Sequence, residues 1–298
     1  MYSGAMEKEL PAQPHADIVT QSSITSSLRS LGVHSGMGLM VHSSLHSFGY
    51  VKGGAATVVA ALMDILTPAG TLLMPTFNHG EPFEPGGAGV FDPRITRTRN
   101  GAIPDYFWRL PGVVRSLDPT HAFAAWGAHA ERYVANHHRT LTMGPHSPLG
   151  LLLADGGSTL LLGVTYGSNT FHHVVEMSTG APCLGRRTEA YPVQLSDGRR
   201  VMGFTWGWRE RACPITDHTR YAARMRERGL DRTTIIGSCE ATLFLLRDCY
   251  DVIAEALREG IDGHPPCRLC PIRPRVVAAT VASDWDDRLY CPLTSGNP

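Results

Sequence analysis

The chain has 298 residues, of which 43% are hydrophobic and 18% charged, a composition that supports a buried core and excludes a disordered chain. Its 27 Lys and Arg residues balance 27 Asp and Glu residues, so no excess positive charge attracts nucleic acid or an anionic membrane surface. No apolar run approaches the ~20 residues that span a bilayer, and the start lacks a signal-peptide pattern, so we expect a cytoplasmic protein. Seven scattered cysteines indicate reduced thiols rather than a disulfide framework.

An amphipathic helix is predicted close to the N-terminus. Ile24, Leu28 and Leu31 recur at helical spacing, which gives this segment one apolar face. We expect the hydroxyl of Ser22 or Ser23 to cap the helix, because a hydroxyl at that position can accept a hydrogen bond from the first free backbone N–H groups.

A βαβ unit follows the first helix. The apolar segments 39–42 and 71–74 predict two short buried strands, and segment 55–66 between them has the periodicity of a helix. A strand, a helix and a strand in this order imply parallel strands with a right-handed crossover. In such folds the binding site lies beyond the carboxyl ends of the strands.

The rest of the chain has less regular apolar spacing but still predicts several helices and strands. They are helical stretches near 104–109 and 128–136, a strand over 158–164, a helix from Thr170, a β-prone region over 191–208, and helices over 217–228 and 238–258. We therefore expect a single α/β domain with a mainly parallel central sheet flanked by helices, extending over 19–260. Residues 1–18 would form a flexible tail and residues 261–298 a C-terminal extension packed on or near the domain.

The clearest chemical pattern lies at the start of the helix that follows the third strand. His173 and Glu176 are three residues apart, which places both side chains on one face of that helix. A carboxylate beside an imidazole can fix its tautomer and stabilise the imidazolium, which is the arrangement of a general base. The alternative is a capped helix with a structural histidine and a solvated glutamate. His172 points about 100° away and is the weaker candidate.

Two polar loops follow the first and second strands. The segment His42, Ser43, Ser44 and Leu45 offers hydroxyls and backbone N–H groups before a helix N-terminus, which suits the phosphates or the carbonyl group of a ligand. Thr76 supplies a hydroxyl where the second strand ends. An ordinary connection and a backbone-bonded threonine are the alternatives.

A pair of cysteines near the C-terminus has the spacing of half a zinc site. Cys267 and Cys270 follow His264, and Cys291 could supply a fourth ligand. Reduced thiols in a proline-rich tail are the alternative, and no metal is expected in the catalytic chemistry.

Taken together, these segments resemble the aminoglycoside 3-N-acetyltransferases, a family distinct in fold from the GCN5-related acetyltransferases. The resemblance runs from about residue 27 to residue 259. It rests on the order and spacing of several motifs, which are Val41-His42-Ser43-Ser44-Leu45, Gly70-Thr71-Leu72 to Met74-Pro75-Thr76, Phe91-Asp92-Pro93, Pro111 to Ser116, Ser147-Pro148-Leu149, and Asn169-Thr170-x-x-His173-x-x-Glu176.

The resemblance implies transfer of acetyl from acetyl-CoA to the 3-amino group of a 2-deoxystreptamine aminoglycoside, and hence antibiotic resistance. It implies that His173 is the general base, that Glu176 orients it and that Thr76 hydrogen-bonds near the thioester. It also implies that the 42–45 loop, with Thr98 and Ile103, binds CoA. A polycationic acceptor needs carboxylates, for which the middle loops offer Glu81, Glu84, Asp92 and Asp118.

The sequence departs from the family pattern in two places. Thr98 stands where serine is frequent, a change that keeps the hydroxyl, and the second departure lies in the motif around Asp118, where the following hydroxyl position is Ala122. Where the family commonly has Arg-Ser-x-His-Pro, this chain has Asp118 in place of the histidine. These departures leave open the acetylation of another small-molecule amine. Two further alternatives are a metal-dependent hydrolase that uses His172, His173 and Glu176 as ligands, and a non-catalytic CoA-binding or interaction protein.

Overall fold

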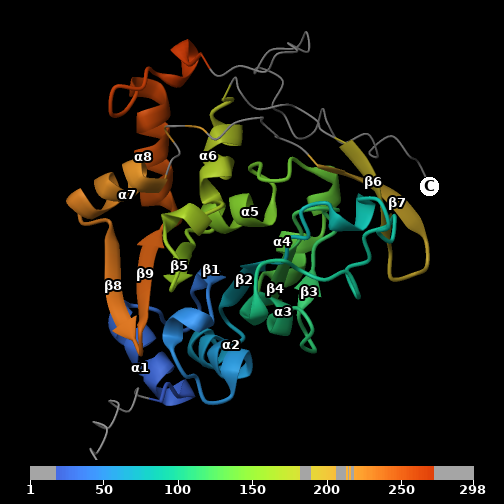
Figure 1. The fold of residues 1–298 in the computed structure, drawn as a ribbon, viewed down its shortest axis with the longest axis horizontal. Helices are drawn as coiled ribbons and strands as arrows, with labels where there is room; N and C mark the ends of the chain where they lie inside the picture. Colours follow the sequence, from blue (N-terminus) through green and yellow to red (C-terminus); the bar gives the residue numbers. More distant parts are fainter. Residues whose placement is uncertain (1–17, 182–188, 206–212, 214, 216–217, 272–298) are drawn as a thin grey trace, which may run out of the picture.

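A computed structural model describes residues 18–181, 189–205, 213, 215 and 218–271 of the chain (Figure 1). Seven strands form one sheet in the order β3-β4-β2-β1-β5-β9-β8. The strands are β1 (Gly38–Ser43), β2 (Thr71–Pro75), β3 (Val114–Arg115), β4 (Phe123–Gly127), β5 (Ser158–Leu162), β8 (Asp231–Ile236) and β9 (Cys239–Leu245). A separate antiparallel pair consists of β6 (Glu189–Gln194) and β7 (Arg200–Thr205).

Helices cover both faces of the large sheet (Figure 1). The α-helices are α1 (Gln21–Leu31), α2 (Gly54–Leu66), α3 (Ala102–Phe107), α4 (Ala130–Val134), α5 (Pro148–Ala154), α6 (Phe171–Ser178), α7 (His218–Glu227) and α8 (Leu246–Glu259). Single 3-10 turns occur at His46–Phe48, Glu81–Phe83, His137–Arg139, Tyr166–Ser168 and Cys267–Leu269. Among the described residues, none of these helices is both long and apolar enough to cross a membrane.

Successive side chains of the central strands pack into two separate hydrophobic cores, one on each face of the sheet. Met40, Leu73 and Leu161 point to the face covered by α4 to α8, whereas their strand neighbours, Leu39 and Leu72 among them, point to the face covered by α1 to α3. This alternation follows from the two-residue period of a strand. The result is a three-layer α/β/α domain.

The centre of the sheet is parallel. β1 pairs in parallel with β2 on one side and with β5 on the other, and α2 connects β1 to β2 as a crossover helix. The expected α/β fold, with a parallel centre and helices on both faces, is confirmed. The outer strands β3, β4, β8 and β9 extend it with antiparallel pairings.

The sequence prediction was wrong in the last part of the sheet. Residues 238–258 were expected to form one helix, but Cys239–Leu245 is strand β9 and the helix begins at Leu246. β9 pairs with β5 over five residues and with β8 over six, and this pairing outweighs the helical spacing of its apolar residues. The preceding strand β8 is rich in β-branched residues and was also missed.

The cap of α1 also differs from the prediction. Thr20 is the N-cap, and its hydroxyl accepts a hydrogen bond from the backbone N–H of Ser23. The Ser23 hydroxyl in turn accepts from the backbone N–H of Thr20, which completes a capping box. The two serines proposed as caps therefore lie inside the helix.

The strand order defines where a ligand can bind. The chain leaves β1 for β2 on one side through α2, and it later returns to pair β5 with the other side of β1. A crevice forms at such a reversal, beyond the carboxyl ends of the strands. The segments that follow β1, β2 and β5 all begin at this edge.

Candidate active site

Helix α6 begins at this edge, and a buried asparagine fixes its start. The Asn169 side chain is 0% exposed, and its Oδ1 atom accepts a hydrogen bond from the Phe171 N–H at 3.3 Å. Its Nδ2 group donates to the Tyr221 hydroxyl on α7 at 3.3 Å and to the Cys249 Sγ atom on α8 at 3.7 Å. Thr170 makes no capping hydrogen bond with its side chain. Asn169 therefore fixes the position of the first turn of α6 relative to α7 and α8.

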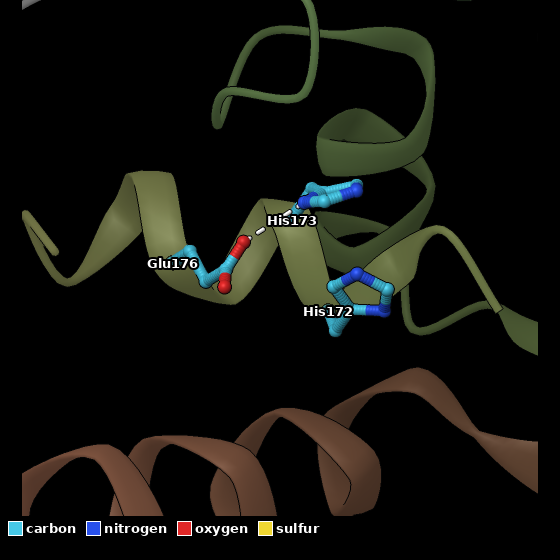
Figure 2. Close-up of side chains that lie close together, drawn as sticks. All are labelled: His172, His173 and Glu176. Carbon is cyan, nitrogen blue, oxygen red and sulfur yellow. Dashed lines mark hydrogen bonds and ion pairs between the residues drawn. The ribbon is translucent and has the colours of Figure 1, made fainter. Parts of the chain in front are cut away.

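The predicted pair on α6 is present. The Nδ1 atom of His173 lies 2.8 Å from Oε2 of Glu176, and the Glu176 side chain is 0% exposed whereas that of His173 is 35% exposed (Figure 2). An ionised carboxylate is only an acceptor, so this contact places the imidazole proton on Nδ1. The Nε2 atom then carries the lone pair that can accept a proton from a substrate.

His172 lies beside the pair rather than apart from it. The ring centroids of His172 and His173 are 4.0 Å apart (Figure 2). Each of His172, His173 and Glu176 also has one potential metal-ligand atom, and these three atoms lie within 4.8 Å of one another. The expected 100° divergence of adjacent helical residues describes their Cα–Cβ directions, and the side-chain torsions bring the two rings back together.

The loop after β1 adjoins the start of α6. The Nε2 atom of His42 lies 3.5 Å from the Thr170 hydroxyl, and the Ser44 N–H donates to the carbonyl of Leu162, at the end of β5. Burial lowers the pKa of His42 to about 3, so this side chain is neutral near pH 7. The Ser43 hydroxyl has no hydrogen-bond partner among the described residues. Three of the predicted CoA-binding residues thus lie at the same edge as His173.

A glycine lets this loop approach the end of β5. Gly163 has φ +65°, and a Cβ atom there would collide with the Ser47 side chain. The Ser47 hydroxyl instead donates to the Gly163 carbonyl at 2.8 Å. Glycine is needed at this position because it adopts a positive φ without strain and leaves room for the first loop.

Thr76 occupies a fully buried position at the end of β2. Its hydroxyl donates to the Ala122 carbonyl at 2.9 Å and accepts from Nε of Arg115 at 2.9 Å. A hydroxyl has one proton, so Thr76 has none left for a thioester in this arrangement. The Arg115 guanidinium also donates to the Thr76 carbonyl at 2.7 Å. Burial lowers the pKa of Arg115 to about 9. A direct role of Thr76 in the reaction stays a prediction and requires its hydroxyl to reorient.

Thr98 and Ile103, the other residues expected to bind CoA, have structural partners. The Thr98 hydroxyl lies 3.2 Å from the Phe77 carbonyl and accepts from the Asn100 N–H at 3.1 Å. Ile103 lies on α3, is 1% exposed and packs in the same core as α2, so only its backbone could reach a ligand. Their contact with CoA stays a prediction.

Two of the four carboxylates expected to face the acceptor are engaged inside the protein. Asp118 is 0% exposed and accepts from the backbone N–H groups of Thr120 and His121 and from the Thr142 hydroxyl. Asp92 forms an ion pair with Arg94 at 2.8 Å, and these contacts lower the pKa of Asp92. Only the other two, Glu81 and Glu84, are exposed.

His121 is a residue that the sequence analysis missed. Its backbone N–H is tied to Asp118, its Nδ1 atom lies 2.7 Å from the Thr120 hydroxyl, and its ring stands 5.3 Å from that of His79. Burial lowers the pKa of His121 to about 4, although the Asp118 carboxylate acts in the opposite direction, and positive charge on His79 or His173 adds to the lowering. A neutral histidine therefore lies within electrostatic reach of His173. No spacing rule connects these two positions in the sequence.

Part of the predicted C-terminal zinc site is present in the fold. The Sγ atom of Cys270 lies 3.5 Å from Nε2 of His264, and Cys267 is partly exposed nearby. Cys291 lies outside the described residues. Among the described residues, three or more potential metal ligands come close together at His172, His173 and Glu176. Zinc in the C-terminal segment stays a prediction.

The pair on α6 is thus an imidazole held by a buried carboxylate, at the carboxyl edge of the parallel strands in the centre of an α/β sheet. The family model for aminoglycoside 3-N-acetyltransferases matches residues 40–258, and the chain belongs to this family. The expected family membership is thereby confirmed.

Named relatives and a solved structure agree with this assignment. Aminoglycoside N(3)-acetyltransferase VII of Streptomyces paromomycinus is 31% identical over 266 residues, covering 78% of this chain and 89% of that protein. The SPbeta prophage-derived aminoglycoside N(3')-acetyltransferase-like protein YokD of Bacillus subtilis is 36% identical over 175 residues, covering 53% of this chain and 64% of that protein. The structure of AAC-IIIb in a binary complex with CoASH has a TM-score of 0.72 at 25% identity and covers 84% of this chain and 100% of that one.

Proposed function

We propose that this protein transfers an acetyl group from acetyl-CoA to the 3-amino group of 2-deoxystreptamine aminoglycosides, with His173 as the general base. The observation that carries the proposal is the 2.8 Å contact between His173 and a fully buried Glu176 at the carboxyl edge of the sheet, in a chain of this family. The names of the relatives support the reaction, and the CoASH complex of AAC-IIIb supports the donor. Use of acetyl-CoA would place the enzyme in the cytoplasm.

In the proposed reaction, the lone pair of the neutral amine attacks the thioester carbonyl carbon. Nε2 of His173 accepts the proton that the amine loses, and a tetrahedral intermediate forms. The carbon–sulfur bond then breaks, and the thiolate leaves and takes up the proton, so the products are the amide and CoA. Glu176 stabilises the imidazolium that exists between these steps. Base catalysis of this kind contributes roughly 10²–10⁴-fold to a rate.

The donor would lie across the loop that follows β1. The partly exposed Ser43 and Ser44 and the backbone N–H groups of that loop lie next to the start of α6, which suits the polar pantetheine chain and the diphosphate. Backbone groups near Thr98, in the loop before α3, and near Ile103, in the first turn of α3, would contact the same ligand. Because both side chains have structural roles, we assign the contact there to the main chain.

Few of the carboxylates expected to face the acceptor are exposed. Asp92 and Asp118 are engaged internally, which leaves Glu81 and Glu84 as the exposed carboxylates of the original set. A polycationic acceptor requires several carboxylates in contact with its ammonium groups. Acetylation of another small-molecule amine, with fewer positive charges, is therefore the second candidate function.

Measurement of thiol release from acetyl-CoA with a panel of acceptors tests the proposal. The panel contains 2-deoxystreptamine aminoglycosides, the same compounds with the 3-amino group removed or already acetylated, and simple mono- and diamines. We expect release only with acceptors that carry a free 3-amino group. Release with the simple amines alone would favour the second candidate, and no release with any acceptor would contradict the proposed reaction.

A further inference from the structure

The histidine that precedes the general base has no role in the proposed reaction, yet it lies against the pair. His172, His173 and Glu176 each present one potential ligand atom, and these atoms lie within 4.8 Å of one another. Figure 2 shows all three side chains on the first turns of α6, with the Glu176 carboxylate directed toward His173. Among the described residues, no comparable group of potential ligands occurs elsewhere.

Two imidazoles and one carboxylate are a donor set that binds zinc in proteins. Three such ligands at about 2.0–2.2 Å from an ion leave a fourth position open, and tetrahedral geometry then places the donor atoms about 3.4 Å apart. The present spacing runs from the 2.8 Å between His173 Nδ1 and Glu176 Oε2 up to the 4.8 Å limit of the group. Small side-chain rotations would therefore bring the donor atoms to coordination distance. Imidazole also suits copper and nickel ions.

We propose that His172, His173 and Glu176 form a binding site for a divalent transition-metal ion such as Zn²⁺, and that the bound ion inhibits the enzyme. An ion on Nδ1 of His173 takes the lone pair of that nitrogen, so the ring proton moves to Nε2, whereas an ion on Nε2 occupies the accepting lone pair itself. In either case His173 cannot accept a proton from the amine. The inhibition rests on the proposed function, but the binding of the ion does not.

The exposure of the three residues fits entry of an ion from the substrate side. The His173 side chain is 35% exposed and His172 is also partly exposed, whereas Glu176 is 0% exposed. An ion would therefore meet the imidazoles first and then the carboxylate behind them. Electrostatic attraction to a carboxylate is stronger where little water screens it.

The proposed ion site can be distinguished from the one predicted near the C-terminus. That second candidate pairs Cys270 with His264 at 3.5 Å and adds Cys267, so it contains thiolate ligands. The first candidate contains only nitrogen and oxygen ligands. Co²⁺ is a suitable probe because its visible absorption reports coordination geometry, and a thiolate ligand adds an intense charge-transfer band in the near ultraviolet.

Titration of the chelator-treated full chain with Co²⁺ and Zn²⁺, without CoA, tests binding directly. The variants are His172→Ala, His172→Gln as a polar replacement, and His264→Ala as a matched control at the other candidate site, with thermal unfolding to confirm that each is folded. We expect both His172 variants to weaken the binding of a single ion by roughly tenfold or more. We expect His264→Ala to leave this binding unchanged and the Co²⁺ spectrum to lack a thiolate band.

Initial rates of thiol release then test inhibition. Each variant is compared with its own metal-free rate, and acetyl-CoA has no free thiol to bind the added Zn²⁺ at the start of the reaction. Wild-type protein should be inhibited, a chelator should restore the rate, and the His172 variants should need more Zn²⁺. Ion binding that is the same in the His172 variants, or that disappears in His264→Ala, would overturn the proposal. Ion binding through His172 in a protein that acetylates no acceptor would refute only the proposed function.

Discussion

Replacing Glu176 with glutamine tests how the pair on α6 works. The substitution keeps the shape of the side chain but removes its charge. The Glu176 side chain is 0% exposed and lies 2.8 Å from Nδ1 of His173, so the charge acts on the imidazole with little screening by water. A glutamine amide can also donate to Nδ1, which would favour the wrong tautomer and place the proton on Nε2.

The size of the effect follows from the geometry. With charge centres about 4 Å apart and an effective dielectric constant of about 20, the carboxylate stabilises an imidazolium by about 4 kcal/mol. Because 1.36 kcal/mol corresponds to a tenfold change in rate, Glu176→Gln should lower kcat by about 10³-fold. The KM for acetyl-CoA should change little, because a fully buried side chain cannot touch the donor.

The assay is acceptor-dependent thiol release at saturating acetyl-CoA. Glu240→Gln is a matched control, because the Glu240 side chain is 58% exposed on β9 and the same charge is removed there. The control should keep the wild-type kcat. A Glu176→Gln enzyme whose kcat stays within about tenfold of wild type would refute the electrostatic reasoning.

Three further predictions concern stability. Burial lowers the pKa of His42 to about 3 and that of His138 to about 4, so between about pH 6.5 and these values only the unfolded chain binds the protons. Within that window the free energy of unfolding should fall as pH decreases, by about 1.4 kcal/mol per histidine per pH unit. Urea unfolding at pH 6 and pH 5 should show a smaller loss in His42→Asn. An unchanged pH dependence in that variant would contradict the assignment. Thr76→Val should cost about 1–3 kcal/mol because Arg115 loses a buried acceptor, whereas Thr76→Ser should keep it; equal unfolding midpoints for the two variants would be the opposite result. Gly163→Ala should cost about 1–3 kcal/mol through its positive φ, and a thermal unfolding temperature equal to that of wild type would contradict this strain argument.

The elements predicted well are those whose residues carry a local period. The strands before and after α2 and the helix itself follow from short apolar runs and one helical face, and the parallel pairing follows from their order. Strand β9 was missed because its apolar residues, Leu243 among them, also fit a helical face that continues into α8. Its pairing with the distant strand β5 decides the outcome, and no local pattern reveals that pairing.

In the candidate site, too, the residues linked by local helical spacing were predicted and those positioned by distant contacts were not. His173 and Glu176 were found because three residues on a helix place two side chains together, and the structure shows that contact. His121 was missed because its position depends on a turn held by Asp118 and on a ring contact with His79, which no local sequence pattern reveals. Asp118 itself was expected to face a cationic acceptor, but a carboxylate in a loop can equally accept backbone N–H groups, and only the folded structure distinguishes the two.

Replacement of His173 by alanine tests the central claim most directly. The measurement combines acceptor-dependent thiol release with calorimetric titration of acetyl-CoA in the absence of acceptor. If His173 is the general base, kcat should fall by roughly 10²–10⁴-fold while the affinity for acetyl-CoA is retained. A variant that binds acetyl-CoA and turns over at nearly the wild-type rate would remove His173 from the mechanism.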